Sequence, residues 1–262
     1  MSLTVTMLDL RLRRRATIGY TLGLAAYAFA IVAMYPSFKT DTSLDKLAQS
    51  DPTLMAAFGV TGSLTSPTGW LNANVYNNFL PLVAVIVAVT YGAWSVAGQD
   101  ENGTLSLVTL LPITRRNLVF QKAIALVLQV IPVVLLTYLL TVLGRSFQLD
   151  VDGAHLAAAN LAGLLLGIDF GALALLVGVV ARSRGLALGI SAAVAAASYL
   201  VSSLTSTVHW LHPARFASLF YWAVGTNPIE RGFALGPVLA LFGTAVALIV
   251  VAAFAMQRHD VR

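Results

Sequence analysis

The amino-acid sequence predicts an all-α integral membrane protein with a six-helix transmembrane bundle, and two observations carry this prediction. Of its 262 residues, 58% are hydrophobic and only 10% are charged, whereas a soluble domain averages about 25% charged residues. The second observation is a succession of six apolar stretches along the chain, each close to the roughly 20 residues that cross a bilayer. A single transmembrane domain, 1–262, is therefore expected.

Each apolar stretch should be an α-helix, because lipid offers no partner to free backbone groups and the alternation typical of a membrane barrel is missing. The link between the fourth and fifth stretches is only Arg182, Ser183 and Arg184. One long helix is the alternative there, but two arginines need a water interface, which favours a break. We expect crossings at about 17–35, 79–97, 123–143, 156–181, 185–208 and 233–256.

The distribution of basic residues predicts the orientation. Six crossings put both termini on one side, and that side would hold eleven Lys and Arg residues against five on the other. The positive-inside rule then predicts cytoplasmic termini and a multi-pass protein of the cytoplasmic (inner) membrane. It also accounts for the formal net charge of +5, so no nucleic-acid partner is expected. The uncharged run 16–38 is longer than a signal-peptide core of about 7–15 residues, which indicates an uncleaved helix.

The outer segments should contain short helices on the membrane surface. Asp51-Pro52 and Ser66-Pro67 are typical helix starts, and Gly59 is a typical helix end. The last outer segment is rich in aromatic residues, and anchoring at the headgroups is favoured over a substrate exit gate. The outer segments are 36–78, 144–155 and 209–232.

Motifs for catalysis and metal binding are missing from the sequence. It has no P-loop, no HExxH, no GxSxG and no cysteine. His209 and His212 are spaced like ligands on one helix face, but without nearby carboxylates a metal site is not predicted. We therefore expect no catalytic residue, no metal and no cofactor on this chain, and its function should be transport, scaffolding or signalling.

The most polar interior stretch is segment 98–122, between the second and third crossings. Asp100 and Glu101 precede the apolar run 105–111, where a helix dipole would favour negative charge. Thr114 is placed to cap a new helix leading into the third crossing. A short helix with an apolar stripe is marginal alone, so it should be buried against something. Either the membrane surface or a groove in a cytoplasmic partner would serve.

This segment resembles the permease subunits of type-2 ABC exporters, the ABC-2 type transporter family. That family commonly shows acidic-x-G-T-L, then L-P-[VI]-[ST]-R-R; here 101–105 is ENGTL and 111–116 is LPITRR. The six crossings, the Arg-rich N-terminus, SPTGWLN at 66–72 and GTNPIERG at 225–232 are also similar to family members. The resemblance covers nearly the whole chain.

The resemblance implies that segment 98–122 includes a cytoplasmic coupling helix that docks on a separate nucleotide-binding subunit. It also implies that 8–15 forms an amphipathic elbow helix on anionic lipid. The expected complex has two ABC ATPase subunits, which bind ATP and Mg²⁺, and two permease copies in a homodimer, with a paralogue as the alternative second copy. The contact residues carried over are Glu101, Gly103, Thr104, Leu105, Leu107, Leu111, Pro112, Arg115 and Arg116.

The function that follows is ATP-driven export of an amphipathic or lipophilic compound: a drug, an antibiotic or a lipid. The alternative is an ATP-independent membrane protein, either a secondary carrier or an assembly scaffold. A reading frame for a P-loop ATPase beside this one would favour the exporter.

Small residues four apart predict close helix packing at Gly163, Gly167 and Gly171, with similar pairs in the first and fifth crossings. Packing within one subunit is favoured over a subunit seam. Asp169 is the one charged residue deep inside a crossing, and helical geometry places it opposite the glycines. It is either a protonated or hydrogen-bonded acid within the bundle or part of a wet substrate pathway.

Overall fold

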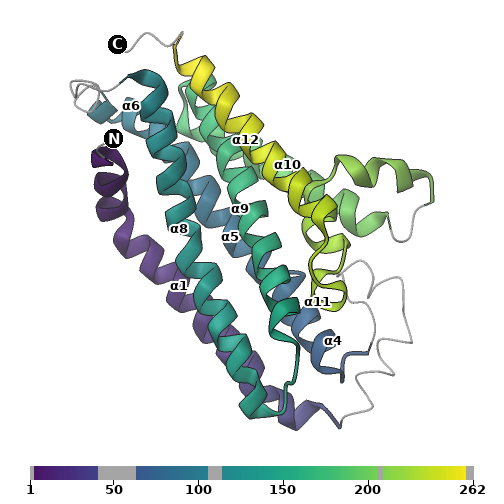
Figure 1. The fold of residues 1–262 in the computed structure, drawn as a ribbon. Helices are drawn as coiled ribbons and strands as arrows, with labels where there is room; N and C mark the ends of the chain where they lie inside the picture. The colour runs from purple at the N-terminus through teal and green to yellow at the C-terminus, as the bar shows by residue number, and fades with distance from the viewer. Residues whose placement is uncertain (1–2, 41–62, 106–113, 206–208, 258–262) are drawn as a thin grey trace.

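The computed structural model describes residues 3–40, 63–105, 114–205 and 209–257. Six of its helical runs are long and apolar enough to cross a membrane, as predicted. Figure 1 shows them as one elongated bundle with the N-terminus, α6 and the C-terminus at one end, which we call the terminal end. The opposite, far end carries α4 and α11. The spans are Thr4–Phe38, Pro67–Glu101, Arg115–Phe147, Gly153–Ala181, Arg184–Leu204 and Leu235–Gln257.

Several spans are composites of consecutive elements. The second combines α4 (Pro67–Leu71), the π-helix η1 (Asn72–Tyr76), α5 (Phe79–Ala93), the π-helix η2 (Trp94–Gly98) and α6 (Gln99–Glu101). The third combines α8 (Arg115–Leu143) with the 3-10 helix η3 (Gly144–Phe147). The remaining elements are α1 (Thr4–Phe38), α9 (Gly153–Ala181), α10 (Arg184–Leu204), η4 (His209–Ala217), η5 (Tyr221–Gly225), α11 (Pro228–Arg231) and α12 (Leu235–Gln257).

Short polar side chains start these helices at the positions that the sequence indicates. Thr114 accepts a hydrogen bond from the Asn117 N–H at 3.3 Å, and Ser66 accepts one from Gly69 at 3.1 Å. Each bond satisfies a first-turn donor that has no partner within its own helix. The predicted starts at Thr114 and Ser66-Pro67 are therefore confirmed. The signals at Asp51-Pro52 and Gly59 lie outside the described residues.

The fourth and fifth crossings are separate helices, and the alternative of one continuous helix is wrong. Helix α9 ends at Ala181, and the next residue, Arg182, has a φ of 53°, in the left-handed region. Ser183 then caps α10, accepting from the Leu186 N–H at 3.4 Å. Arg182 and Arg184, which flank this turn, are both exposed, as their charge requires.

The predicted glycine face packs α9 against α5. A methyl group added at Gly167 would lie 3.1 Å from the Ala84 carbonyl oxygen, and one at Gly171 would lie 2.9 Å from the Ala88 side chain. From the other side, a methyl group on Gly92 would lie 2.3 Å from the Gly171 carbonyl oxygen. The hydrophobic effect does not drive helices together in lipid, so close van der Waals packing through small residues holds α5 and α9 together instead.

Glycines in the first and fifth crossings behave differently. A methyl group added at Gly19, Gly23 or Gly189 would meet nothing within 4 Å. These positions therefore do not serve packing within the subunit, which was the favoured interpretation. Their faces are open on the surface of α1 and α10.

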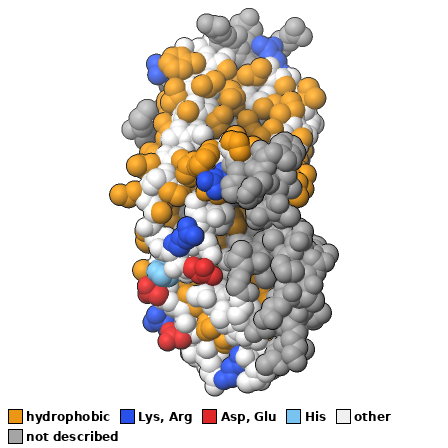
Figure 2. Space-filling model, turned by 90° about the vertical axis from the view of Figure 1, so that its right-hand side faces the viewer, with side chains coloured by type: hydrophobic (Ala, Val, Ile, Leu, Met, Phe, Trp, Pro, Cys, Tyr) orange, Lys and Arg blue, Asp and Glu red, His pale blue; other side chains and the backbone are white. Residues whose placement is uncertain are grey.

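Much of the bundle surface is apolar, as lipid contact requires. On α12, Leu239, Phe242 and Phe254 each have more than half of their surface exposed. Figure 2 shows apolar side chains gathered over the upper part of one face, with basic side chains at its upper end and both acidic and basic side chains in its lower half. This distribution places the long apolar stretches in the hydrocarbon layer and the charges near its boundary.

The first crossing differs from its predicted bounds. Helix α1 runs without a break from Thr4 to Phe38, so residues 8–15 continue directly into the crossing. Within them, Leu8 and Leu12 are exposed while Asp9 is buried. The segment therefore has the two faces of an amphipathic helix, although the structure does not separate it as a distinct elbow.

Candidate functional site

The candidate site is the terminal end of the bundle, where the predicted coupling segment leaves and re-enters the helices (Figure 1). The structure describes this segment up to Leu105 and again from Thr114. Six of the nine predicted contact residues are therefore placed: Glu101, Gly103, Thr104, Leu105, Arg115 and Arg116. The other three, Leu107, Leu111 and Pro112, lie outside the described residues.

The segment begins with a turn that requires glycine. Helix α6 ends at Glu101, and Gly103 follows with a φ of 69°, donating its N–H to the Asp100 carbonyl at 3.0 Å. Side chains with a Cβ rarely adopt this conformation. Thr104 then donates its hydroxyl to the Gln99 carbonyl at 3.1 Å, which closes the turn back onto α6.

Glu101 links this turn to the start of α10. Its Oε1 accepts a hydrogen bond from the Arg184 backbone N–H at 2.8 Å, although the Glu101 side chain is exposed. A carboxylate is favoured there because the first N–H groups of a helix lack partners and carry partial positive charge. The acid of the predicted motif thus connects the second crossing to the fifth.

Leu105 anchors the segment to the bundle. It is fully buried, and it joins an apolar cluster with residues from α1, η2, α8, α9 and α12. Val5, Val96 and Leu118 are members of this cluster. In this conformation the Leu105 side chain faces the protein interior. The exposed predicted residues are Glu101, Gly103, Thr104 and Arg116, and the Arg116 guanidinium lies 5.3 Å from the Phe254 ring of α12.

A buried ionic cluster beneath this segment was not predicted. The Lys122 Nζ of α8 lies 2.9 Å from Oδ2 and 3.1 Å from Oδ1 of Asp9 in α1. The same ammonium donates to Gln99 Oε1 at 2.8 Å, and both charged side chains are 0% exposed. Tyr91 completes the group, which we call the Asp9 cluster: Asp9, Tyr91, Gln99 and Lys122.

Hydrogen bonds compensate for the burial of this ion pair. The Asp9 carboxylate accepts from Tyr91 at 2.7 Å and from Gln99 Nε2 at 3.1 Å, in addition to Lys122. Removing a carboxylate and an ammonium from water is costly unless the remaining lone pairs and protons are satisfied. The Asp9 cluster meets this condition with partners from three spans: α1, the run from α5 to α6, and α8.

Further contacts hold α1 at the same level. Gln121 of α8 accepts the first-turn Val5 N–H at 3.0 Å, and its own carbonyl accepts from the Thr6 hydroxyl at 2.9 Å. Arg13 turns inward, donating to Thr90 at 3.2 Å with its guanidinium 5.4 Å from the Trp94 ring. The start of α1 is therefore fixed to both helices that flank residues 102–114.

Neither Lys122, at the end of segment 98–122, nor Asp9 was predicted to have a role. One signal was present: Asp9 is the only acidic residue among the first 40, and it stands four residues after Val5 on one helix face. Its partner could not be read from the sequence, because Lys122 is 113 residues away.

Asp169 lies near the middle of α9 and is 0% exposed. Neither carboxylate oxygen has a hydrogen-bond partner of standard geometry among the described residues. The Thr244 hydroxyl of α12 faces this carboxyl but donates to the Ala240 carbonyl at 2.7 Å. Asp169 thus faces α12 whereas the glycines face α5, the opposed arrangement that helical geometry predicts.

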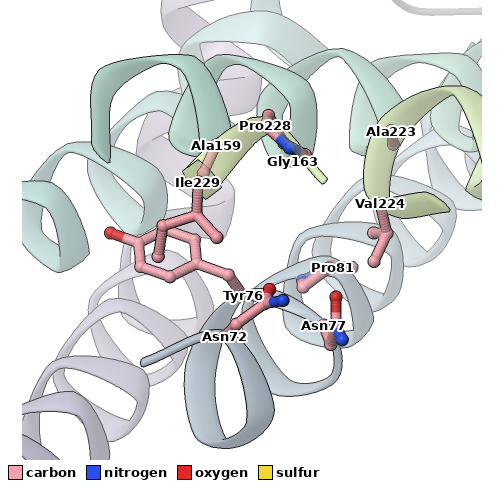
Figure 3. A pocket seen from close by; sticks show the side chains of 10 residues that line it. All are labelled: Asn72, Tyr76, Asn77, Pro81, Ala159, Gly163, Ala223, Val224, Pro228 and Ile229. Atoms are coloured by element: carbon pink, nitrogen blue, oxygen red, sulfur yellow. The ribbon is translucent and has the colours of Figure 1, made fainter. Parts of the chain in front are cut away.

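The far end is joined by a second polar group. Tyr76 shares a hydrogen bond of 2.8 Å with Thr141 and accepts one from Asn160 at 2.9 Å. Asn72 donates to Asn227 at 3.2 Å, which ties η1 to the residue before α11. Figure 3 shows the cavity left between these elements, which is about 10 Å³ and has room for about one water molecule.

Comparison with protein families decides the assignment of the chain. A family model described as ABC-2 family transporter protein matches residues 3–215. The chain belongs to this family. The ABC-2 match runs from the start of α1 into η4 and includes both the predicted coupling segment and the Asp9 cluster. A comparison with curated proteins finds no match.

Membership of the ABC-2 family makes this chain a membrane subunit of a transporter, and an ABC ATPase is the general partner of such subunits. Among the residues that the structure describes, no three His, Cys, Asp or Glu side chains come together. The side chains of His209 and His212 are outside that description.

Proposed function

We propose that this ABC-2 subunit is the permease of an ATP-driven export complex in the inner membrane, with both termini in the cytoplasm. ATP and Mg²⁺ would bind to a separate nucleotide-binding subunit that docks on segment 98–122. The observation that carries the proposal is the double attachment of this segment: Gln99 and Lys122, at its two sides, are both bonded to Asp9.

Rigid attachment is what a coupling element needs. A force applied by a partner to exposed side chains such as Glu101, Thr104 and Arg116 would move α6 and the start of α8 together, because the Asp9 cluster joins them. The Glu101 bond to Arg184 would carry the same motion to α10. Packed elements with bonded contacts shift as units, so motion of the segment would reach several crossings at once.

The open glycine faces support a second copy of the permease. Gly19, Gly23 and Gly189 leave space on the surface of α1 and α10, where another helix could approach closely. We propose a homodimer with two ATPase subunits. The chain contains no cysteine, so one introduced cysteine is unique. Gly23→Cys should form a disulfide-linked dimer in membranes, whereas Leu239→Cys on exposed α12 should not.

An amphipathic or lipophilic substrate suits the composition of the bundle. The walls between helices are apolar, and Asp169 is the one acid at depth among the described helices. A compound with an apolar body would cross such a path without losing a large hydration shell.

Docking is tested by placing a charge in the apolar run of the coupling segment. The chain would be co-expressed with an ABC ATPase encoded beside it, purified, and reconstituted for transport. Leu107→Asp and Leu111→Asp should leave membrane insertion intact but abolish ATPase co-purification and transport, because a buried carboxylate opposes docking. Leu107→Met is the matched control. Co-purification at the wild-type level with normal transport would contradict the assignment, as would uphill transport by this chain alone in liposomes.

A further inference from the structure

A groove between α1 and α8 suggests a binding site for a membrane lipid. Its volume is about 280 Å³, and it lies on the outer surface of the bundle. The apolar part is formed by Ile18 and Leu22 of α1 together with Leu128 and Pro132 of α8. Pro132 cannot donate the backbone hydrogen bond that would close the helix onto the Leu128 carbonyl. The groove therefore has an apolar lining at a weakened point of α8.

One end of the groove carries a positive charge. Arg14 lines it and is exposed, whereas the neighbouring Arg13 turns into the protein toward Trp94. Positions 14, 18 and 22 are each one helical turn apart, so they form a single row on α1 with the guanidinium at its beginning. Charge and apolar surface thus follow one another along the groove.

The length of α1 places this charge at the headgroup level. The helix has 35 residues, which is more than the roughly 20 that cross the hydrocarbon core. Counting about 20 residues back from Phe38 puts the hydrocarbon boundary near Ile18, one turn beyond Arg14. The apolar part of the groove then lies among the acyl chains and Arg14 lies among the phosphates.

We propose that this groove binds an anionic phospholipid, with a lipid phosphate on Arg14 and an acyl chain along Ile18, Leu22 and Leu128. A guanidinium forms paired hydrogen bonds with phosphate, and the apolar side chains that line the groove offer a surface along which an acyl chain can pack. Leu10 and Arg14 are on the outer side of the same helix stretch whose inner side carries Asp9. Bound lipid would therefore support the part of α1 that holds the Asp9 cluster. This site does not depend on the partner ATPase.

The test is lipid binding to the purified chain, measured by native mass spectrometry with dioleoyl phosphatidylglycerol and, in parallel, dioleoyl phosphatidylcholine. Arg14→Gln should weaken phosphatidylglycerol binding about tenfold, the loss expected for one charge-assisted contact. Arg15→Gln removes the same charge from the next position, outside the groove, and should retain wild-type affinity. Equal losses in both variants would indicate general attraction to anionic lipid and would overturn the site, as would no loss in either.

A second pair of variants tests the groove itself. Ile18→Trp should block the acyl-chain path and reduce phosphatidylglycerol binding, while Tyr20→Trp, an exposed position outside the groove lining, should not. The wild-type chain should also gain thermal stability from added phosphatidylglycerol, and Arg14→Gln should not. Wild-type affinity in Ile18→Trp would contradict the proposal, because the charge alone would then account for binding.

Discussion

Lys122 and Asp9 form a fully buried ion pair of 2.9 Å between the third crossing and the start of the first. Each of them has a further bond to Gln99, on the second crossing, so three helices meet at one polar point. This point lies directly beside both ends of the predicted coupling segment. It is the strongest candidate for the element that transmits motion from a partner into the bundle.

Removing one charge of this pair should destabilise the protein more than removing both charges. Asp9→Asn leaves an uncompensated buried ammonium, and a loss of about 3–5 kcal/mol is typical. The double change Asp9→Leu with Lys122→Met removes both charges and should recover part of the loss, because the buried polar groups of Tyr91 and Gln99 then lose their partners. The measurement is thermal unfolding in detergent. Arg145→Met, which breaks an exposed pair with Asp150, is the control and should have little effect.

The same variants separate stability from coupling. If the Asp9 cluster transmits motion, the double variant should fold and bind the ATPase yet lose transport, because the polar connection between crossings is gone. Normal transport by the double variant would show that apolar packing is sufficient there.

Gly92 is predicted to be intolerant of alanine. The added methyl group would lie 2.3 Å from the Gly171 carbonyl oxygen, so α5 and α9 would have to separate, at a cost of about 1–3 kcal/mol. Gly243→Ala on α12 is the matched control, since it meets nothing within 4 Å and gains helix propensity. Unfolding temperatures of the two variants should move in opposite directions, and a stable Gly92→Ala would contradict the observed packing.

Glu101→Ala should loosen the start of α10. The substitution removes the acceptor of the Arg184 N–H, so hydrogen exchange at residues 184–187 should become faster. Asp100→Ala removes the adjacent acid, which takes no part in that bond, and should leave the exchange rates unchanged. If both variants exchange at the wild-type rate, Ser183 alone is sufficient to cap α10.

Asp169→Asn tests whether the buried acid takes part in transport. The amide is nearly the same size as the carboxyl, so the fold should remain and only the chemistry changes. We expect efflux and the ATPase activity of the partner to fall, because an amide cannot exchange a proton or attract a cation. Unchanged efflux and unchanged ATPase activity would make Asp169 a packing residue. The variant Thr244→Val, measured in the same way, would show whether the neighbouring hydroxyl on α12 contributes to transport.

Much of this architecture could be predicted from local sequence. Runs of apolar residues indicate six crossings because the bilayer sets their length. The glycines at 163, 167 and 171 predict a close-packed face because only small residues allow such approach. Thr114 and Ser66 predict helix starts, because each side-chain oxygen can accept a hydrogen bond from the free backbone N–H three residues later in the sequence. The ABC-2 motif at 101–116 likewise predicts its family from neighbouring residues.

Only the tertiary structure decided which charges are buried together and which glycines are covered. Asp9 and Lys122 are 113 residues apart, and no local pattern pairs them. Gly19 and Gly167 have similar sequence surroundings, yet one faces open space and the other the backbone of α5. The physical reason is that a sequence records which surfaces a helix offers, whereas burial depends on the neighbours that the whole bundle places against them.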